Sequence, residues 1–127
     1  MTREVVTAER FLTDPALGRQ VEDVPVPELG NGAVVPVWGM TPRERTEFED
    51  RLSRNKKGKA SIRERWVVEC CRNDDGTKIF NPTQIEQLGQ RSAVVVERLV
   101  NAALRLSGVT GEDLEKLVKN SEAAPED

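Results

Sequence analysis

Histidine and tyrosine are absent from this 127-residue sequence, and aromatic residues of any kind are scarce. The lack of histidine removes the commonest general base, the commonest metal ligand and every histidine-assisted serine or cysteine nucleophile. A phosphate-binding glycine loop and a metal-spaced set of cysteines are also missing. The sequence therefore predicts a protein that is not an enzyme, with no catalytic, cofactor-binding or metal-binding residues.

Cysteine is nearly absent too, because Cys70 and Cys71 are the only two and they are adjacent. Neighbouring cysteines form only a strained disulfide, and two thiols alone make a poor zinc site. We expect two reduced, partly buried thiols. No apolar run reaches the length of a signal-peptide core or a membrane span, so we expect an intracellular protein with no membrane partner.

The charge is unevenly distributed, although the net value is only −3. Residues 41–72 contain ten lysines and arginines against six acidic residues, whereas the rest of the chain contains nine against sixteen. A basic middle section between acidic ends favours contacts that are steered by charge. The acidic total and the lack of a basic recognition helix argue against a nucleic-acid partner.

Hydrophobic periodicity predicts an α+β fold, a mostly helical single domain with an N-terminal β-hairpin and a central buried helix. Residues 1–18 are expected to form an N-terminal arm with a short helix, residues 19–119 the domain, and residues 120–127 a disordered acidic tail. Within the domain we expect a hairpin at 20–39 and helices at about 41–53, 61–72, 82–89, 91–107 and 111–119.

The central helix is predicted from the apolar segment SAVVVERLVNAALRL. Its apolar residues recur at helical spacing, which is typical of a helix that is buried on several sides. Ser92 is expected to cap its start and Gly108 to end it in a left-handed conformation. The stripe consists of Val96, Leu99, Val100, Ala103 and Leu106.

Local signals also place the hairpin and the helix after it. Asn31-Gly32 is a strong hairpin-turn signal, and nearby prolines keep both strands at sheet edges. Thr41 and Glu44 form the pattern of a capping box, with Pro42 at the first helical position. Trp66 is expected in the core, with its indole N–H bound to a partner.

Two apolar helix faces are candidate partner-binding surfaces. Phe48 and Leu52 lie one turn apart on an otherwise charged helix, and Leu114, Leu117 and Val118 form the stripe of the last helix. The alternative for both faces is ordinary packing against the central helix.

Several short motifs follow one another in a recognisable order. Gly39-Met40-Thr41 leads into the capped helix, Asp74-Asp75-Gly76 precedes Ile79-Phe80, residues 85–92 lead into the apolar helix, and residues 106–121 close the series. Together, over about residues 7–121, this order resembles the tail assembly chaperones of long-tailed (siphovirus-type) bacteriophages.

The resemblance implies a protein that binds the tape measure protein, keeps it soluble and promotes tail tube assembly. It implies a location in the host cytoplasm during infection and absence from the mature virion. Many members of the family have a longer form made by a programmed frameshift, and this chain would be the short form. The tail tube protein, the longer form and further copies of the chain are then expected partners.

Two other interpretations remain open from the residues. A small structural protein of the virion, for tail completion or head–tail joining, would also be acidic, α+β and without catalytic residues. A nucleic-acid-binding regulator would use the basic middle section. A structural protein would be found in purified particles, whereas a chaperone would be missing from them.

Overall fold

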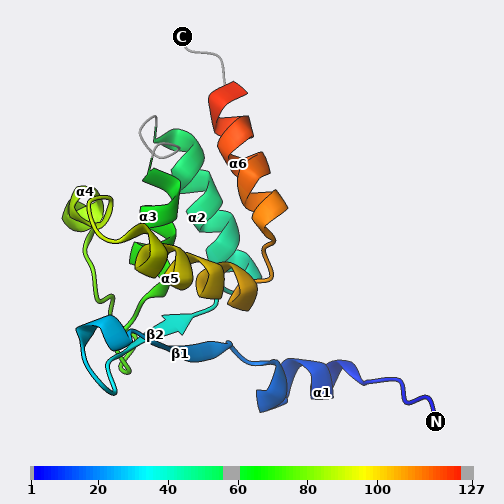
Figure 1. Ribbon diagram of the computed structural model, residues 1–127. Helices are drawn as coiled ribbons and strands as arrows, with labels where there is room; N and C mark the ends of the chain where they lie inside the picture. The colour runs from blue at the N-terminus through cyan, green and yellow to red at the C-terminus, as the bar shows by residue number, and fades with distance from the viewer. Residues whose placement is uncertain (1, 56–60, 124–127) are drawn as a thin grey trace.

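The computed structural model describes residues 2–55 and 61–123, and its fold is the mostly helical α+β domain that the sequence predicts. The chain is 58% helical, with one two-stranded antiparallel hairpin near the N-terminus (Figure 1). The helices are α1 (Ala8–Thr13), α2 (Pro42–Arg54), α3 (Ile62–Cys70), α4 (Ile85–Leu88), α5 (Ala93–Leu106) and α6 (Gly111–Ala123). The strands are β1 (Val21–Pro25) and β2 (Val34–Trp38), and single 3-10 turns lie at Pro15–Leu17, Pro27–Leu29 and Pro82–Gln84.

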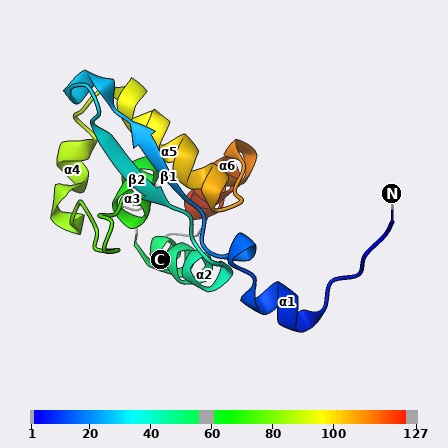
Figure 2. The ribbon, with the colours of Figure 1, turned by 90° about the horizontal axis from the view of Figure 1, so that it is seen from below.

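Helix α5 is the centre of the domain, as predicted. It packs against α3 and against both strands, and Val100 and Ala103 have no exposed surface (Figure 2). Its first turn differs from the prediction, because Val94 is 70% exposed and Ser92 makes no capping hydrogen bond through its side chain. Gly108 ends the helix in the predicted left-handed conformation, with a φ of 71°.

The hairpin has the predicted strands, and the predicted turn lies within a longer loop. Val21 pairs with Trp38 and Pro25 with Val34, so residues 26–33 form the loop. The amide of Ala33 donates to the carbonyl of Gly30, which places Asn31-Gly32 in a tight turn inside that loop. Asn31 keeps a negative φ, so this turn is not the two-residue hairpin type, which needs a positive φ at both central residues.

Two helix ends differ from the prediction for identifiable reasons. Helix α3 stops at Cys70 because Cys71 leaves the helix to form a β-bridge with Val37 and the amide of Arg72 donates to the carbonyl of Pro36. Helix α6 runs to Ala123, so residues 120–123 are helical and are not part of a disordered tail. The sequence places no helix-breaking residue before Pro125, and residues 124–127 of the predicted tail lie outside the described residues.

Aromatic packing fixes the position of Trp66, which is fully buried. Its ring meets Phe48 edge-to-face, with 5.1 Å between the ring centroids. The prediction of a hydrogen-bonded indole was wrong, because Nε1 has no acceptor among the described residues. This position in α3 places the indole in the apolar interior, where its packing offsets the cost of the unpaired N–H.

The hairpin and α5 come closest at Gly39. A Cβ atom on this residue would overlap the carbonyl oxygen of Leu106 at the end of α5. One residue later, the amide of Met40 donates to Ser107 Oγ at 2.9 Å. Glycine at position 39 is therefore required for the hairpin to reach the end of the central helix.

We predict that Gly39→Ala destabilises the protein by about 1–3 kcal/mol, because backbone atoms must move to admit the methyl group. The measurement is chemical denaturation followed by circular dichroism. Gly111→Ala is the matched control, since a Cβ there meets no atom within 4 Å. Equal free energies of unfolding for the two variants would contradict this account of Gly39.

Cys70 and Cys71 are both free thiols with no exposed surface. Burial raises the pKa of each thiol to about 12, and the neighbouring charge of Glu69 adds to the effect at Cys70. We predict that a thiol reagent at pH 8 labels neither cysteine in the folded protein and both after unfolding in guanidinium. Mass spectrometry measures the labelling. Fast labelling of the native protein would contradict the prediction and show that this part of the core opens.

Candidate functional site

A hollow of about 210 Å³ lies between α2, α3 and the segment that leads into α4. It opens to solvent and combines an apolar floor with a charged rim. The turn at Pro82–Gln84 starts α4, and Asn81 caps that turn by accepting from the amide of Thr83. The lining residues are Phe48, Arg51, Leu52, Asn55, Arg65, Val68, Glu69, Lys78, Pro82 and Ile85.

The floor comes from side chains that also belong to the core. Phe48 and Leu52 are buried one turn apart on α2, and Val68 is buried on the facing side of α3. Ile85, at the start of α4, is half-buried and completes the apolar wall. The thin apolar face of α2 is therefore shared between the core and a surface recess.

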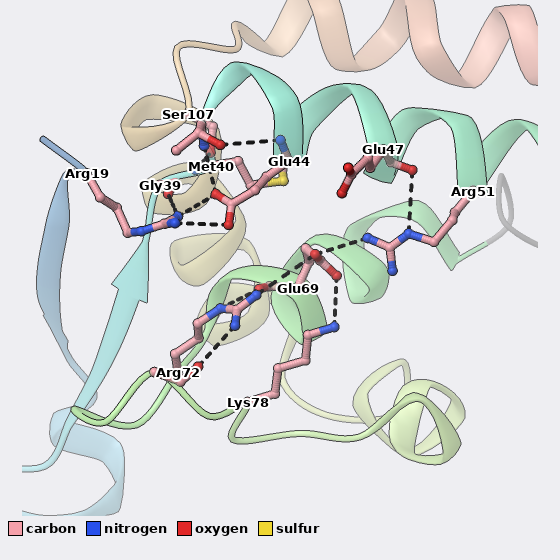
Figure 3. A network of polar contacts seen from close by, with 12 residues as sticks. Arg19, Gly39, Met40, Glu44, Glu47, Arg51, Glu69, Arg72, Lys78 and Ser107 are labelled. Atoms are coloured by element: carbon pink, nitrogen blue, oxygen red, sulfur yellow. Dashed lines mark hydrogen bonds and ion pairs between the residues drawn. The ribbon is translucent and has the colours of Figure 1, made fainter. Parts of the chain in front are cut away.

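The rim is mainly cationic. Glu69 is the one acid among the described residues of the rim, and it accepts from Arg51 Nη2 at 3.0 Å and from Lys78 Nζ at 3.0 Å (Figure 3). Arg72 stands at 3.9 Å from the same carboxylate. Arg65 donates from Nε to Ser61 Oγ and makes no ion pair with a described residue. The lining residues thus carry three cationic groups against one carboxylate.

The cations around Glu69 keep it ionised. Burial alone would raise the pKa of Glu69, but the hydrogen bonds and charges of Lys78 and Arg51 outweigh it and hold the pKa below its usual value. The carboxylate is therefore a fixed anion that orders two of the rim cations and leaves the hollow with a net positive charge.

A second polar network fixes the start of α2 against the hairpin (Figure 3). Arg19 reaches Glu44 with two hydrogen bonds, of 2.5 and 2.9 Å, and also donates to the carbonyl of Gly39 at 2.8 Å. Glu44 completes the predicted capping box with Thr41. The hydrogen bonds from Arg19 lower the pKa of Glu44 to about 2. This network holds the segment before β1 at the N-terminal end of α2.

The structure brings only some of the predicted partner-binding residues together. Phe48 and Leu52 both line the hollow. Leu114 is buried, and Leu117 and Val118 are half-buried against the core, so α6 uses its apolar stripe for packing against the domain core. Partner binding through any of these five side chains stays a prediction.

The rest of the hollow was missed by the sequence analysis. Val68, Lys78 and Ile85 come from separate segments, and only the tertiary fold places them beside α2. Arg65 carried no local signal beyond its place in the basic middle section. No motif in the sequence could have identified this set, because its members share neither spacing nor chemistry.

The N-terminal arm, residues 2–18, is a second surface of interest. None of the residues in α1 is buried, and the helix extends away from the rest of the domain (Figures 1 and 2). Thr7 caps α1 by accepting from the amide of Arg10. The exposed large apolar side chains of the arm are Val5, Val6, Phe11, Leu12 and Leu17.

Neither a metal site nor a membrane span is evident in the part of the chain that the structure describes. No group of three or more cysteine or acidic side chains there could hold a metal ion. No helix among residues 2–55 and 61–123 combines the length and the apolar character needed to cross a bilayer. Comparison with protein families, curated proteins and solved structures gave no match.

The pKa of Glu44 predicts how stability depends on pH. Its folded-state pKa of about 2 lies below the usual 4.5, so its contact with Arg19 stabilises the protein above about pH 5. That contribution is lost as the pH falls toward 2. Glu69, whose pKa is also lowered, acts in the same direction.

We therefore predict that Glu44→Gln costs about 1 kcal/mol or less at pH 7, and that the loss disappears near pH 2. Glutamine can still complete the capping box, so the variant isolates the contact with Arg19. Urea denaturation at several pH values measures the effect. Glu115→Gln, on the exposed face of α6, is the control, and the same pH profile for both variants would refute the role of Glu44.

Proposed function

We propose that this chain is the short, non-frameshifted form of a phage tail assembly chaperone, which binds and solubilises the tape measure protein and promotes tail tube assembly. The observation that carries the proposal is the hollow between α2, α3 and α4, which has an apolar floor and a cationic rim. The order of motifs over residues 7–121 is its second support.

The hollow suits a client helix whose apolar side chains have acidic residues beside them. One or two apolar side chains from a helix face can reach Phe48, Leu52 and Ile85, while Arg65 and Lys78 meet carboxylates beside them. A recess of about 210 Å³ gives weak binding at one site. Many copies along a long client would add their affinities, which suits a protein that must later be released.

In this role the chain has protein partners only. The chain acts as a binding protein and not as an enzyme, with no cofactor, no nucleic acid and no membrane among its partners. The tail tube protein, a longer frameshifted form and other copies of the chain are its further partners. It works in the host cytoplasm during infection and leaves before the virion is mature.

Co-expression with the tape measure protein of the same phage tests the proposal. We predict that the client becomes soluble and co-purifies with the wild-type chain. The Ile85→Asp variant should lose most of both effects, because a carboxylate then stands in the apolar wall. Aspartate in the first turn of α4 is compatible with the helix, so the variant is expected to fold.

Val94→Asp is the matched control, since it places the same charge on an exposed apolar site outside the hollow. A client that stays insoluble with the wild-type chain would refute the proposal. Mass spectrometry of purified particles separates it from the structural alternative, because a tail-completion or head–tail joining protein would be present in them.

A further inference from the structure

The N-terminal arm has apolar surface that its own domain does not cover. Phe11 is 60% exposed and Leu12 is 79% exposed, on a helix with no buried residue. Val6, Phe11 and Leu17 lie around a shallow apolar recess of the arm itself. Several exposed apolar side chains on one protruding segment are typical of a segment that is buried in an assembly.

The arm is nevertheless built as a defined structure. Thr7 caps α1, Glu4 accepts from Arg10 Nη1 at 2.9 Å, and Asp14 caps the 3-10 turn through the amide of Ala16. A helix of six residues gains little stability from its own hydrogen bonds in water. Its caps therefore prepare a conformation that packing against another surface would stabilise.

The charge of the arm complements that of the hollow. Residues 2–18 contain three acidic residues, Glu4, Glu9 and Asp14, against two arginines. The hollow has three cationic groups against Glu69. The apolar side chains of the arm and the apolar floor of the hollow are thus flanked by opposite net charges, which favours their pairing.

The arm points away from the hollow of its own chain. Arg19 is held by Glu44 at the N-terminal end of α2, whereas the hollow lies along the C-terminal half of that helix, from Phe48 onward. Both ribbon views place α1 and α4 on opposite sides of the domain (Figures 1 and 2). The arm that fills the hollow would thus be supplied by a second copy of the chain.

We propose that the arm of one copy inserts Phe11 and Leu12 into the hollow of a second copy. The contact is heterologous, because each copy offers an arm to one neighbour and a hollow to another, so copies add head to tail. The inference rests on the proposed function in one respect, because the arm and the client use the same hollow. A client segment that enters the hollow displaces the arm, so client binding and self-association oppose each other.

The test uses three variants of the full chain: Phe11→Asp in the arm, Ile85→Asp in the hollow, and Val94→Asp as the control. Sedimentation velocity over a range of concentrations measures the association of each. We expect wild type and Val94→Asp to associate alike, and each of the other two to weaken association by about tenfold or more. Circular dichroism confirms that every variant is folded.

A mixture of Phe11→Asp and Ile85→Asp decides the geometry. The first variant has an intact hollow and the second an intact arm, so the mixture should form a one-to-one dimer and nothing larger. Association of Ile85→Asp alone at wild-type strength would overturn the proposal, since it would place the arm against a different surface. Wild type that stays monomeric at every concentration would overturn it as well.

The Phe11→Asp variant separates arm exchange from client binding. Phe11→Asp should still solubilise the tape measure protein, because its hollow is intact and its own arm no longer competes. A chaperone that binds its client and never associates refutes the arm exchange alone. A chain that associates through its arm but leaves the client insoluble refutes the chaperone assignment alone.

Discussion

The approach of Gly39 to the end of α5 is the contact on which most of the architecture depends. It allows Met40 to bond to Ser107 and brings the hairpin onto the central helix. Helix α2 begins three residues later, and the network of Arg19 and Glu44 then fixes its start. Two further ion pairs, Arg98 with Glu28 and Arg105 with Glu22, join α5 to the hairpin.

The position of α2 then determines the candidate site. Its buried residues Phe48 and Leu52 contact the core beside Trp66, yet part of each side chain faces the recess next to α3. The thin apolar face of α2 can both pack on the core and line the recess because the core below it is small. The cations beside that face are ordered by Glu69, which a rim of independent lysines would not achieve.

Features set by neighbouring residues were predictable from the sequence. The capping box of α2, the left-handed Gly108 and the amphipathic α5 all follow from local side-chain chemistry. The burial of Phe48 and Leu52 followed from their spacing. These signals were sufficient for the fold class and for most helix positions.

Features set by distant residues were not predictable. The hairpin loop depends on strand register, the end of α3 on pairing with β2, and the hollow on segments that meet only in the folded chain. The missing hydrogen bond of the Trp66 indole was also not predictable, because the residues around the ring come from several elements. Helix α1 protrudes because none of its residues is buried against the domain, and no local sequence pattern predicts this.

The two tryptophans give this protein a built-in pair of optical reporters. Trp66 lies in an apolar interior with no hydrogen bond among the described residues, whereas the half-buried Trp38 lies under the guanidinium of Arg19, 5.5 Å from its ring centroid. Emission from the first follows the state of the core. Emission from the second follows its surroundings at the junction that carries the arm, so one fluorescence spectrum contains contributions from the core and from that junction.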